Sequence, residues 1–180
     1  TRADAPFAGA KTIESWPFLI NVDVAAPGDT SAVVVFGDST VDGDGTTADA
    51  NRRWPDYLAR RFAAAPVGGV RYSVLNLGLI GNRLLRASPG AGSKFGDALG
   101  AAGVDRFASD VLAQPGVSCV VLRIGVNDIG FPGTFAPRDA PVTAALLAGR
   151  GPSAAIGPAA HPADARATTR AGRRLPTPRA

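Results

Sequence analysis

The sequence predicts an α/β fold built on a parallel sheet. Three short apolar runs, rich in β-branched residues, begin near residues 32, 70 and 117, and segments with helical periodicity lie between them. Strands that alternate with helices in this way pair in parallel through crossover connections. The chain has 180 residues, of which 46% are apolar, so one domain with a substantial core can form.

The first predicted elements lie in the N-terminal third. Residues 15–24 are rich in β-formers and predict a strand or an extended segment, so residues 1–31 are either a lead-in or the end of a preceding β-segment. The continuous apolar run 32–36 is typical of a strand covered on both faces. Large apolar side chains recur every four residues over 54–62, which predicts a helix with one apolar stripe, and Pro55 suits its first turn.

Two further strands are predicted, at 70–77 and 117–124, with a mainly helical region interrupted by glycines over 83–112. The only cysteine of the chain, Cys119, lies in the last strand and cannot form an internal disulfide. Its apolar neighbours indicate a buried side chain that acts as a small hydrophobe.

The composition changes after residue 148. Of the 32 residues in 149–180, 24 are Ala, Arg, Pro or Gly, and such a segment cannot bury enough apolar surface to offset its ordering entropy. We therefore expect a domain over 32–148 that is incomplete at its C-terminus, followed by an irregular tail whose composition suggests a frame-shift or truncation. The chain begins at Thr1 and contains no Met, which suggests a processed or excised piece.

The charge distribution excludes some partners. The net charge is +4, but residues 149–180 hold six Arg and one Asp, a balance of +5, so the rest of the chain sums to −1. A slightly acidic folded part and a tail without interleaved aromatics argue against nucleic-acid binding. No apolar run reaches the roughly 18 residues of a transmembrane helix. Asp42 and Asp44 lie among glycines, yet their spacing lacks the rest of a calcium loop, so no metal site is expected.

A polar, glycine-bearing cluster follows each predicted strand. Residues 37–39 (Gly-Asp-Ser) follow the first strand, residues 78–82 (Gly-Leu-Ile-Gly-Asn) the second, and residues 125–128 (Gly-Val-Asn-Asp) the third. Ligands of open parallel sheets bind beyond the carboxyl ends of the strands. The three clusters are therefore expected to converge on one crevice.

The chemistry of these clusters suits acyl transfer, which needs a nucleophile and donors aimed at a developing oxyanion. Ser39 offers a hydroxyl and its own backbone N–H. Gly81 offers a backbone N–H with no side chain in the way, and Asn127 offers a side-chain amide. Two backbone donors and one amide can form an oxyanion hole.

The clusters, in this order, resemble the first three sequence blocks of the SGNH (GDSL-type) hydrolase family. Gly37 and Asp38 with the following Ser39 resemble the family's nucleophile block, and Gly81 matches the block that supplies a backbone oxyanion donor. The resemblance covers roughly residues 32–140. It implies a flavodoxin-like three-layer α/β fold.

The third cluster resembles the family's Gly-x-Asn-Asp block through Gly125, Asn127 and Asp128, with Asn127 as the side-chain oxyanion donor. The resemblance implies a serine esterase that cleaves small acyl esters, such as acetylated sugars or short lipid esters, through an acyl-enzyme. It implies no cofactor and no metal, and it is compatible with secretion.

Structural explanations compete with these roles. Residues 37–39 could form an ordinary turn after a strand, and Gly81 could serve only a tight turn. Asn127 and Asp128 could cap a helix N-terminus. Asp38 and Asp128 are expected to order loops rather than to act as acid or base.

The family's last block, Asp-x-x-His, has no clear counterpart. The only histidine is His161, and the residue three positions before it is Pro158 rather than an acid. His161 is the one candidate base in the sequence; otherwise it is a solvated side chain in the tail. The second hypothesis is therefore a catalytically impaired remnant that binds carbohydrate or lipid esters without efficient turnover.

Overall fold

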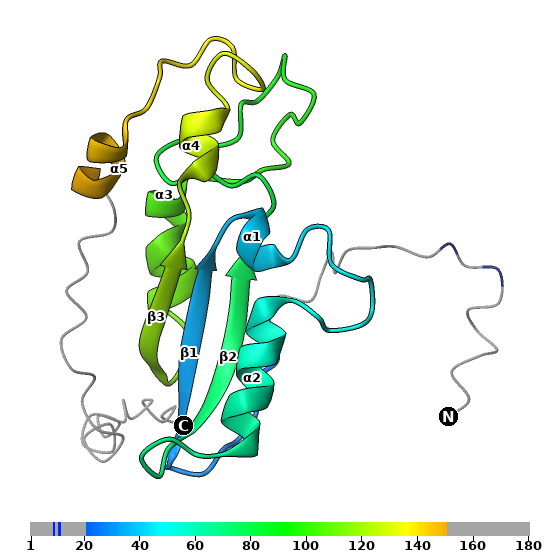
Figure 1. Ribbon diagram of the computed structural model, residues 1–180, viewed down its shortest axis with the longest axis vertical. Helices are drawn as coiled ribbons and strands as arrows, with labels where there is room; N and C mark the ends of the chain where they lie inside the picture. The colour runs from blue at the N-terminus through cyan, green and yellow to red at the C-terminus, as the bar shows by residue number, and fades with distance from the viewer. Residues whose placement is uncertain (1–8, 10, 12–20, 151–180) are drawn as a thin grey trace, which may run out of the picture.

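The computed structural model describes residues 9, 11 and 21–150 (Figure 1). In the described part strands and helices alternate along the chain. In order they are β1 (Thr30–Gly37), α1 (Ser39–Asp42), α2 (Trp54–Ala64), β2 (Arg71–Gly78), α3 (Gly103–Phe107), the π-helical turn η1 (Ala108–Leu112), β3 (Val117–Arg123), α4 (Val126–Gly130) and α5 (Ala144–Arg150).

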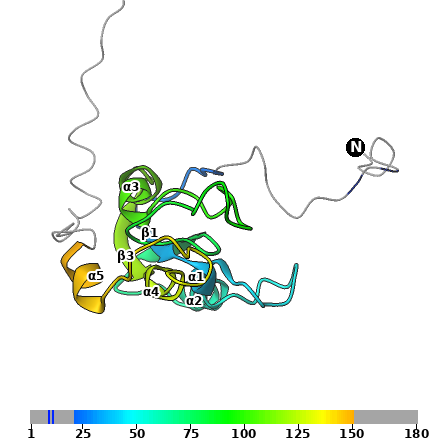
Figure 2. The ribbon, with the colours of Figure 1, turned by 90° about the horizontal axis from the view of Figure 1, so that it is seen from above.

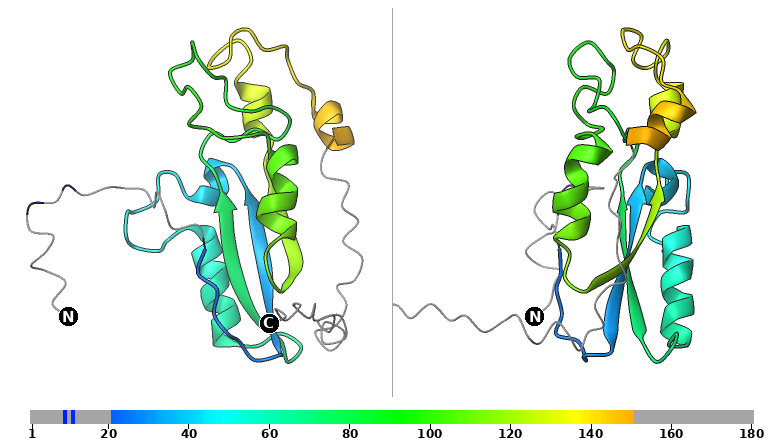
Figure 3. Two further views of the ribbon diagram at one scale, coloured as in Figure 1. Left: turned by 180° about the vertical axis from the view of Figure 1, so that it is seen from behind. Right: turned by 90° about the vertical axis from the view of Figure 1, so that its left-hand side faces the viewer.

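The three strands form one parallel sheet in the order β2-β1-β3. Helix α2 lies on one face of the sheet, and α3 with η1 lies on the other (Figures 2 and 3). The predicted α/β class, the parallel sheet and the three layers are confirmed. The predicted strands also agree with the observed ones to within two residues at each end.

The core forms around β1, the central strand. Every residue of β1 after Thr30 is buried, because β1 has a strand on each side and helices on both faces. Val34 and Phe36 pack against Phe107 and Val111, and the two phenyl rings meet edge to face with centroids 5.6 Å apart. Each such side chain stabilises the fold by about 1.5–3 kcal/mol.

Helix α2 begins where the sequence predicts and has a charged first turn. The Arg53 backbone N–H donates to Asp56 Oδ2 at 2.9 Å, and the Arg53 guanidinium also donates to both carboxylate oxygens, at 2.9 and 3.0 Å. These hydrogen bonds from Arg53 lower the pKa of the Asp56 carboxyl. An ionised carboxylate at this end also interacts favourably with the helix dipole.

The prediction of a mainly helical region over 83–112 is wrong for its first part. Residues 83–102 consist of turns, bends and isolated bridges, and helix begins only at Gly103. Four glycines in this segment adopt positive φ, which an α-helix does not accept. They are Gly90, Gly92, Gly96 and Gly100.

The prediction that Cys119 is buried is also wrong, since its side chain is exposed. Cys119 pairs with Val33 of β1, and among the described residues β3 has a neighbouring strand on one side only. Helix α2 packs mainly on β2, at the other edge of the sheet. The apolar neighbours in sequence therefore do not bury the thiol.

The ends of the chain lie largely outside the described residues. Within the predicted lead-in, residues 21–24 form no regular element, and Val22 and Val24 are 70% and 78% exposed. Helix α5 continues across the predicted boundary at 148 to Arg150, and residues 151–180 are not described. Among the described residues, no helix is both long and apolar enough to cross a bilayer.

Candidate active site

The carboxyl ends of all three strands meet at one edge of the sheet. Gly37, the last residue of β1, lies opposite Gly78 of β2 and Arg123 of β3. Backbone hydrogen bonds between the neighbouring segments continue at the strand ends: Leu79 N donates to Gly37 O at 3.1 Å, and Asp38 N donates to Arg123 O at 3.3 Å. The three predicted clusters therefore emerge side by side, with α1 and α4 above the sheet (Figure 1).

Ser39 is the first residue of the short helix α1 and is half-buried. The preceding Asp38, only 1% exposed, caps this helix: its Oδ1 accepts from Thr40 N at 3.0 Å and from Thr40 Oγ1 at 2.8 Å. Asp38 thus fixes the turn that presents Ser39. Among the described residues, nothing accepts a hydrogen bond from Ser39 N.

Two side chains from other elements hold α1 in place. Trp54 Nε1, at the start of α2, donates to Thr40 O at 2.9 Å. Asn76 Nδ2, near the end of β2, donates to Val41 O at 2.8 Å, and its Oδ1 accepts from Gly78 N at 3.0 Å. The helix that carries Ser39 is therefore tied to both neighbouring elements.

Two glycines at the strand ends allow this close packing. A Cβ on Gly37 would lie 2.2 Å from Arg123 O, and a Cβ on Gly78 would lie 2.1 Å from Asp42 N. Both obstacles are backbone atoms, which cannot move aside as a flexible side chain can. Glycine is required at both positions because another backbone segment lies too close for a side chain, and not because of an unusual φ.

Gly81 lies in the turn that follows β2. The turn is closed by a hydrogen bond from Asn82 N to Leu79 O at 3.0 Å, and Gly81 has φ +67°. Gly81 therefore does serve a tight turn. Its N–H takes no part in the hydrogen bond that closes the turn and has no acceptor among the described residues. This N–H is free to serve as a donor as well.

Asn127 lies in the first turn of α4 and is half-buried. Its Nδ2 donates one hydrogen to Asn82 O at 2.9 Å, and its second hydrogen has no acceptor among the described residues. The alternative that Asn127 or Asp128 caps the helix is wrong, because the N-cap is Gly125, at φ 119°, and no side chain caps this end. The amide instead joins the third cluster to the second.

Asp128 is 1% exposed and fastens the same two loops. Its carboxylate oxygens accept from Leu84 N at 2.5 Å and from Leu85 N at 2.8 Å. Buried carboxylates need such donors to offset the loss of hydration. Asp128 therefore orders the chain after Gly81, as expected for a loop-ordering role.

Arg106 of α3 completes the network, and the sequence analysis did not identify it. Its side chain is 11% exposed and donates to Asn82 Oδ1 at 3.0 Å, and also to Gly37 O and Leu77 O, both at 3.1 Å. The one available sequence signal was the (i, i+4) spacing to Asp110, which indicates an ordinary surface pair.

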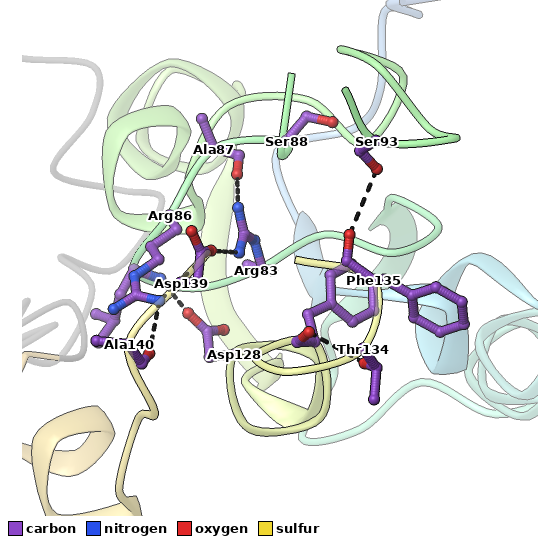
Figure 4. A network of polar contacts seen from close by, with 12 residues as sticks. Arg83, Arg86, Ala87, Ser88, Ser93, Asp128, Thr134, Phe135, Asp139 and Ala140 are labelled. Atoms are coloured by element: carbon purple, nitrogen blue, oxygen red, sulfur yellow. Dashed lines mark hydrogen bonds and ion pairs between the residues drawn. The ribbon is translucent and has the colours of Figure 1, made fainter. Parts of the chain in front are cut away.

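A second buried arginine joins the loops above the site. Arg83 is 4% exposed, pairs with Asp139, donates to Ala87 O, and leaves its Nε without a partner among the described residues (Figure 4). Arg86 also reaches Asp139, at 3.4 Å. A pocket of about 200 Å³ opens between residues 89–93 and 135–139.

Asp42, the last residue of α1, has a raised carboxyl pKa. Burial raises the pKa of Asp42, the charge of Arg53 opposes this, and the charge of Asp44 adds to it. Among the described residues, no group of three or more His, Cys, Asp or Glu side chains could hold a metal ion.

A sequence profile of the GDSL-like Lipase/Acylhydrolase family matches residues 35–175. The match includes all three clusters and most of the chain. The chain belongs to this family. Membership in the GDSL-like lipase/acylhydrolases confirms the resemblance on which the site was predicted.

Solved structures give a more distant match. Three structures of one protein, AlinE4, described as an SGNH-hydrolase family esterase, each cover 58% of this chain and 44% of theirs, with a TM-score of 0.41. The crystal structure and an Asp-to-Ala variant are 21% identical to the chain, and a Ser-to-Ala variant is 20% identical. The chain thus spans less than half the length of this esterase. No curated protein matches the sequence significantly.

The structure places most of the predicted site residues close to one another. The structure brings Ser39, Gly81 and Asn127 to one edge of the sheet through the hydrogen bonds described above, with Gly37, Asp38, Gly125 and Asp128 in supporting positions. His161, the only candidate base, lies outside the described residues.

Proposed function

We propose that this GDSL-like domain hydrolyses carboxylic esters through an acyl-enzyme formed on Ser39. The observation that carries the proposal is the Asn127–Asn82 hydrogen bond, which ties the loop after β3 to the loop that contains Gly81. Both loops lie at the sheet edge from which Ser39 emerges. This arrangement supports a site in which Ser39 is the nucleophile and Ser39, Gly81 and Asn127 supply the donors.

The proposed reaction has two steps. Ser39 Oγ attacks the ester carbonyl, and the N–H groups of Ser39 and Gly81 with Asn127 Nδ2 stabilise the oxyanion. The alcohol leaves with a proton, and water then cleaves the acyl-enzyme to release the acid and restore Ser39. A histidine base takes and returns the proton, and His161 is the residue that we propose for it.

For the substrate we propose a small acyl ester, such as an acetylated sugar or a short lipid ester. The half-buried position of Ser39 agrees with a site that is open to solvent. The family resemblance suggests this range of substrates.

A second candidate is an ester-binding remnant without efficient turnover. Its support is that Pro158, rather than an acid, stands three positions before the only histidine of the sequence, His161. Loss of a triad base lowers the rate by several orders of magnitude, while the oxyanion donors alone retain residual catalysis.

Hydrolysis of a chromogenic acetate ester by the full chain separates the two candidates. The test compares the wild type with Ser39→Ala, His161→Ala and the control Ser73→Ala, an exposed residue near the amino end of β2. The first proposal expects activity that is lost in Ser39→Ala and His161→Ala and kept in Ser73→Ala. Activity that survives Ser39→Ala contradicts it, and ester binding without turnover supports the remnant.

A further inference from the structure

The Arg106 guanidinium donates hydrogen bonds to four acceptors, of which only the Asp110 carboxylate is charged. Its guanidinium donates to the last carbonyl of β1, Gly37 O, and to Leu77 O near the end of β2, both at 3.1 Å. It also donates to Asn82 Oδ1 at 3.0 Å and to Asp110 Oδ2 at 2.9 Å. One side chain thus joins both strand ends that precede the site to the loop after β2.

Asn82 connects Arg106 to Asn127 through hydrogen bonds. The Asn82 side chain is completely buried, and its Nδ2 donates to Leu99 O at 2.9 Å and to Ala101 O at 2.8 Å. Its Oδ1 is held by Arg106, and its main-chain oxygen accepts the hydrogen bond from Asn127 Nδ2. Asn82 also follows Gly81 directly, and the Asn82 N–H donates to Leu79 O at 3.0 Å, which closes the turn that carries the Gly81 N–H.

We propose that Arg106 is a positioning residue, which acts through Asn82 to hold the Gly81 N–H and the Asn127 amide in the orientation that an oxyanion needs. This inference rests on the proposed function and extends it to a residue remote from the nucleophile. Misplacement of a catalytic group by about 1 Å can lower a rate about 100-fold.

The contacts require a guanidinium rather than a positive charge alone. The group is planar and lies over the Phe36 ring, with its central carbon 4.0 Å from the ring centroid, while its N–H groups diverge toward four acceptors. A lysine ammonium has three donors at one point and cannot span these acceptors. Arg106→Lys therefore keeps the charge beside Asp110 but loses the bridge to Asn82.

The kinetic test compares Arg106→Lys and Arg106→Met with the control Arg60→Lys. Arg60 is exposed, lies on α2 and donates to a loop carbonyl, that of Asn51. For a chromogenic acetate ester we expect kcat to fall roughly 10- to 100-fold in both Arg106 variants, with KM changed less than about twofold.

Binding of a boronic acid, which forms a tetrahedral adduct on the serine, should weaken in proportion to the loss of kcat/KM. A purely structural role predicts lower thermal stability with unchanged kcat per folded molecule. That result would overturn the inference, as would an Arg106→Lys variant that matches Arg60→Lys.

A second measurement does not depend on activity. In ¹⁵N-labelled protein that carries Ser39→Ala, the side-chain amide resonances of Asn127 and Asn82 report their hydrogen bonds. We expect Arg106→Lys to shift both pairs and Arg60→Lys to shift neither. If the wild type is inactive but these resonances respond, the proposed function fails and the positioning role stands. Unchanged Asn127 resonances contradict the positioning role whatever the activity.

Discussion

Asn127 Nδ2 donates a 2.9 Å hydrogen bond to the main-chain oxygen of Asn82, 45 positions earlier in the chain. The bond uses one of the two amide hydrogens and fixes the direction of the other. It also prevents the loop after β2 from moving independently of α4. This contact therefore links the segments that carry two of the proposed oxyanion donors.

Asn127→Ala should lower kcat for an acetate ester about 10²- to 10³-fold, the usual cost of one oxyanion donor. KM should change little, because the donor acts mainly in the transition state. Steady-state kinetics measure both constants, with the exposed Asn21→Ala as the control. Equal kcat values in the two variants would exclude Asn127 as a donor.

Gly81→Ala should be more destabilising than Gly68→Ala. Both glycines have positive φ, +67° and +60°, so each substitution carries about 1–2 kcal/mol of backbone strain. A Cβ at Gly81 would also lie 2.7 Å from Leu99 Cδ2, whereas nothing lies within 4 Å of one at Gly68. The clash should add about 1–3 kcal/mol. Urea unfolding measures the free energy of unfolding of both variants. Equal losses of stability would contradict the prediction, because they would mean that the Leu99 side chain moves aside without destabilising the fold.

Asp139→Asn should destabilise the protein more than Arg83→Met does. The first variant leaves the guanidinium of Arg83, which is 4% exposed, without its carboxylate, and breaking a buried pair in this way costs about 3–5 kcal/mol. The second variant removes the buried charge, and Asp139 keeps contact with solvent and with Arg86. Thermal unfolding compares the two, with the exposed Asp97→Asn as the control. The opposite order would contradict the assignment of Asp139 as the counter-ion.

The Arg53–Asp56 pair should make stability depend on acid pH. Hydrogen bonds from Arg53 lower the pKa of Asp56 below its ordinary 3.8, so the folded state favours the ionised carboxylate. This contribution is complete above the unfolded pKa and is lost as the pH falls from there through the folded pKa. Asp56→Asn should therefore reduce the free energy of unfolding at pH 7, and the difference from the wild type should narrow below about pH 4.

Asp105→Asn is the matched control for that experiment. Asp105 also lies in the first turn of a helix, is exposed, and has no ion-pair partner in the described part of the chain. It should change stability little at any pH. A constant difference between Asp56→Asn and the wild type from pH 7 to pH 3 would contradict the pairing.

The sequence predicts the sheet and the three loops well because both depend on local patterns. β1 is a continuous β-branched run, and such a run occurs where both faces are covered. Gly81 and Asn127 follow strands directly, so the parallel arrangement alone brings them to one edge. Asp38 and Asp128 order loops, as expected from residue type and position.

The remaining features depend on contacts between distant segments. Arg106 binds groups at Gly37 and Asn82, and nothing in its neighbourhood in sequence distinguishes it from a surface arginine. Burial of Cys119 was predicted from its apolar neighbours, but burial depends on which strand or helix covers β3. The helical prediction over 83–112 is wrong for residues 83–102, because the glycines of this segment adopt conformations that interrupt a helix in spite of the apolar periodicity.

The exposed Cys119 offers a route to spectroscopy of this domain. It is the only cysteine in the chain, and it lies at the third position of β3, near the amino end of the strand. The loops of the site lie beyond the carboxyl end of the same strand. A fluorophore or spin label on this thiol would report on the domain from the far end of the sheet, without blocking access to Ser39.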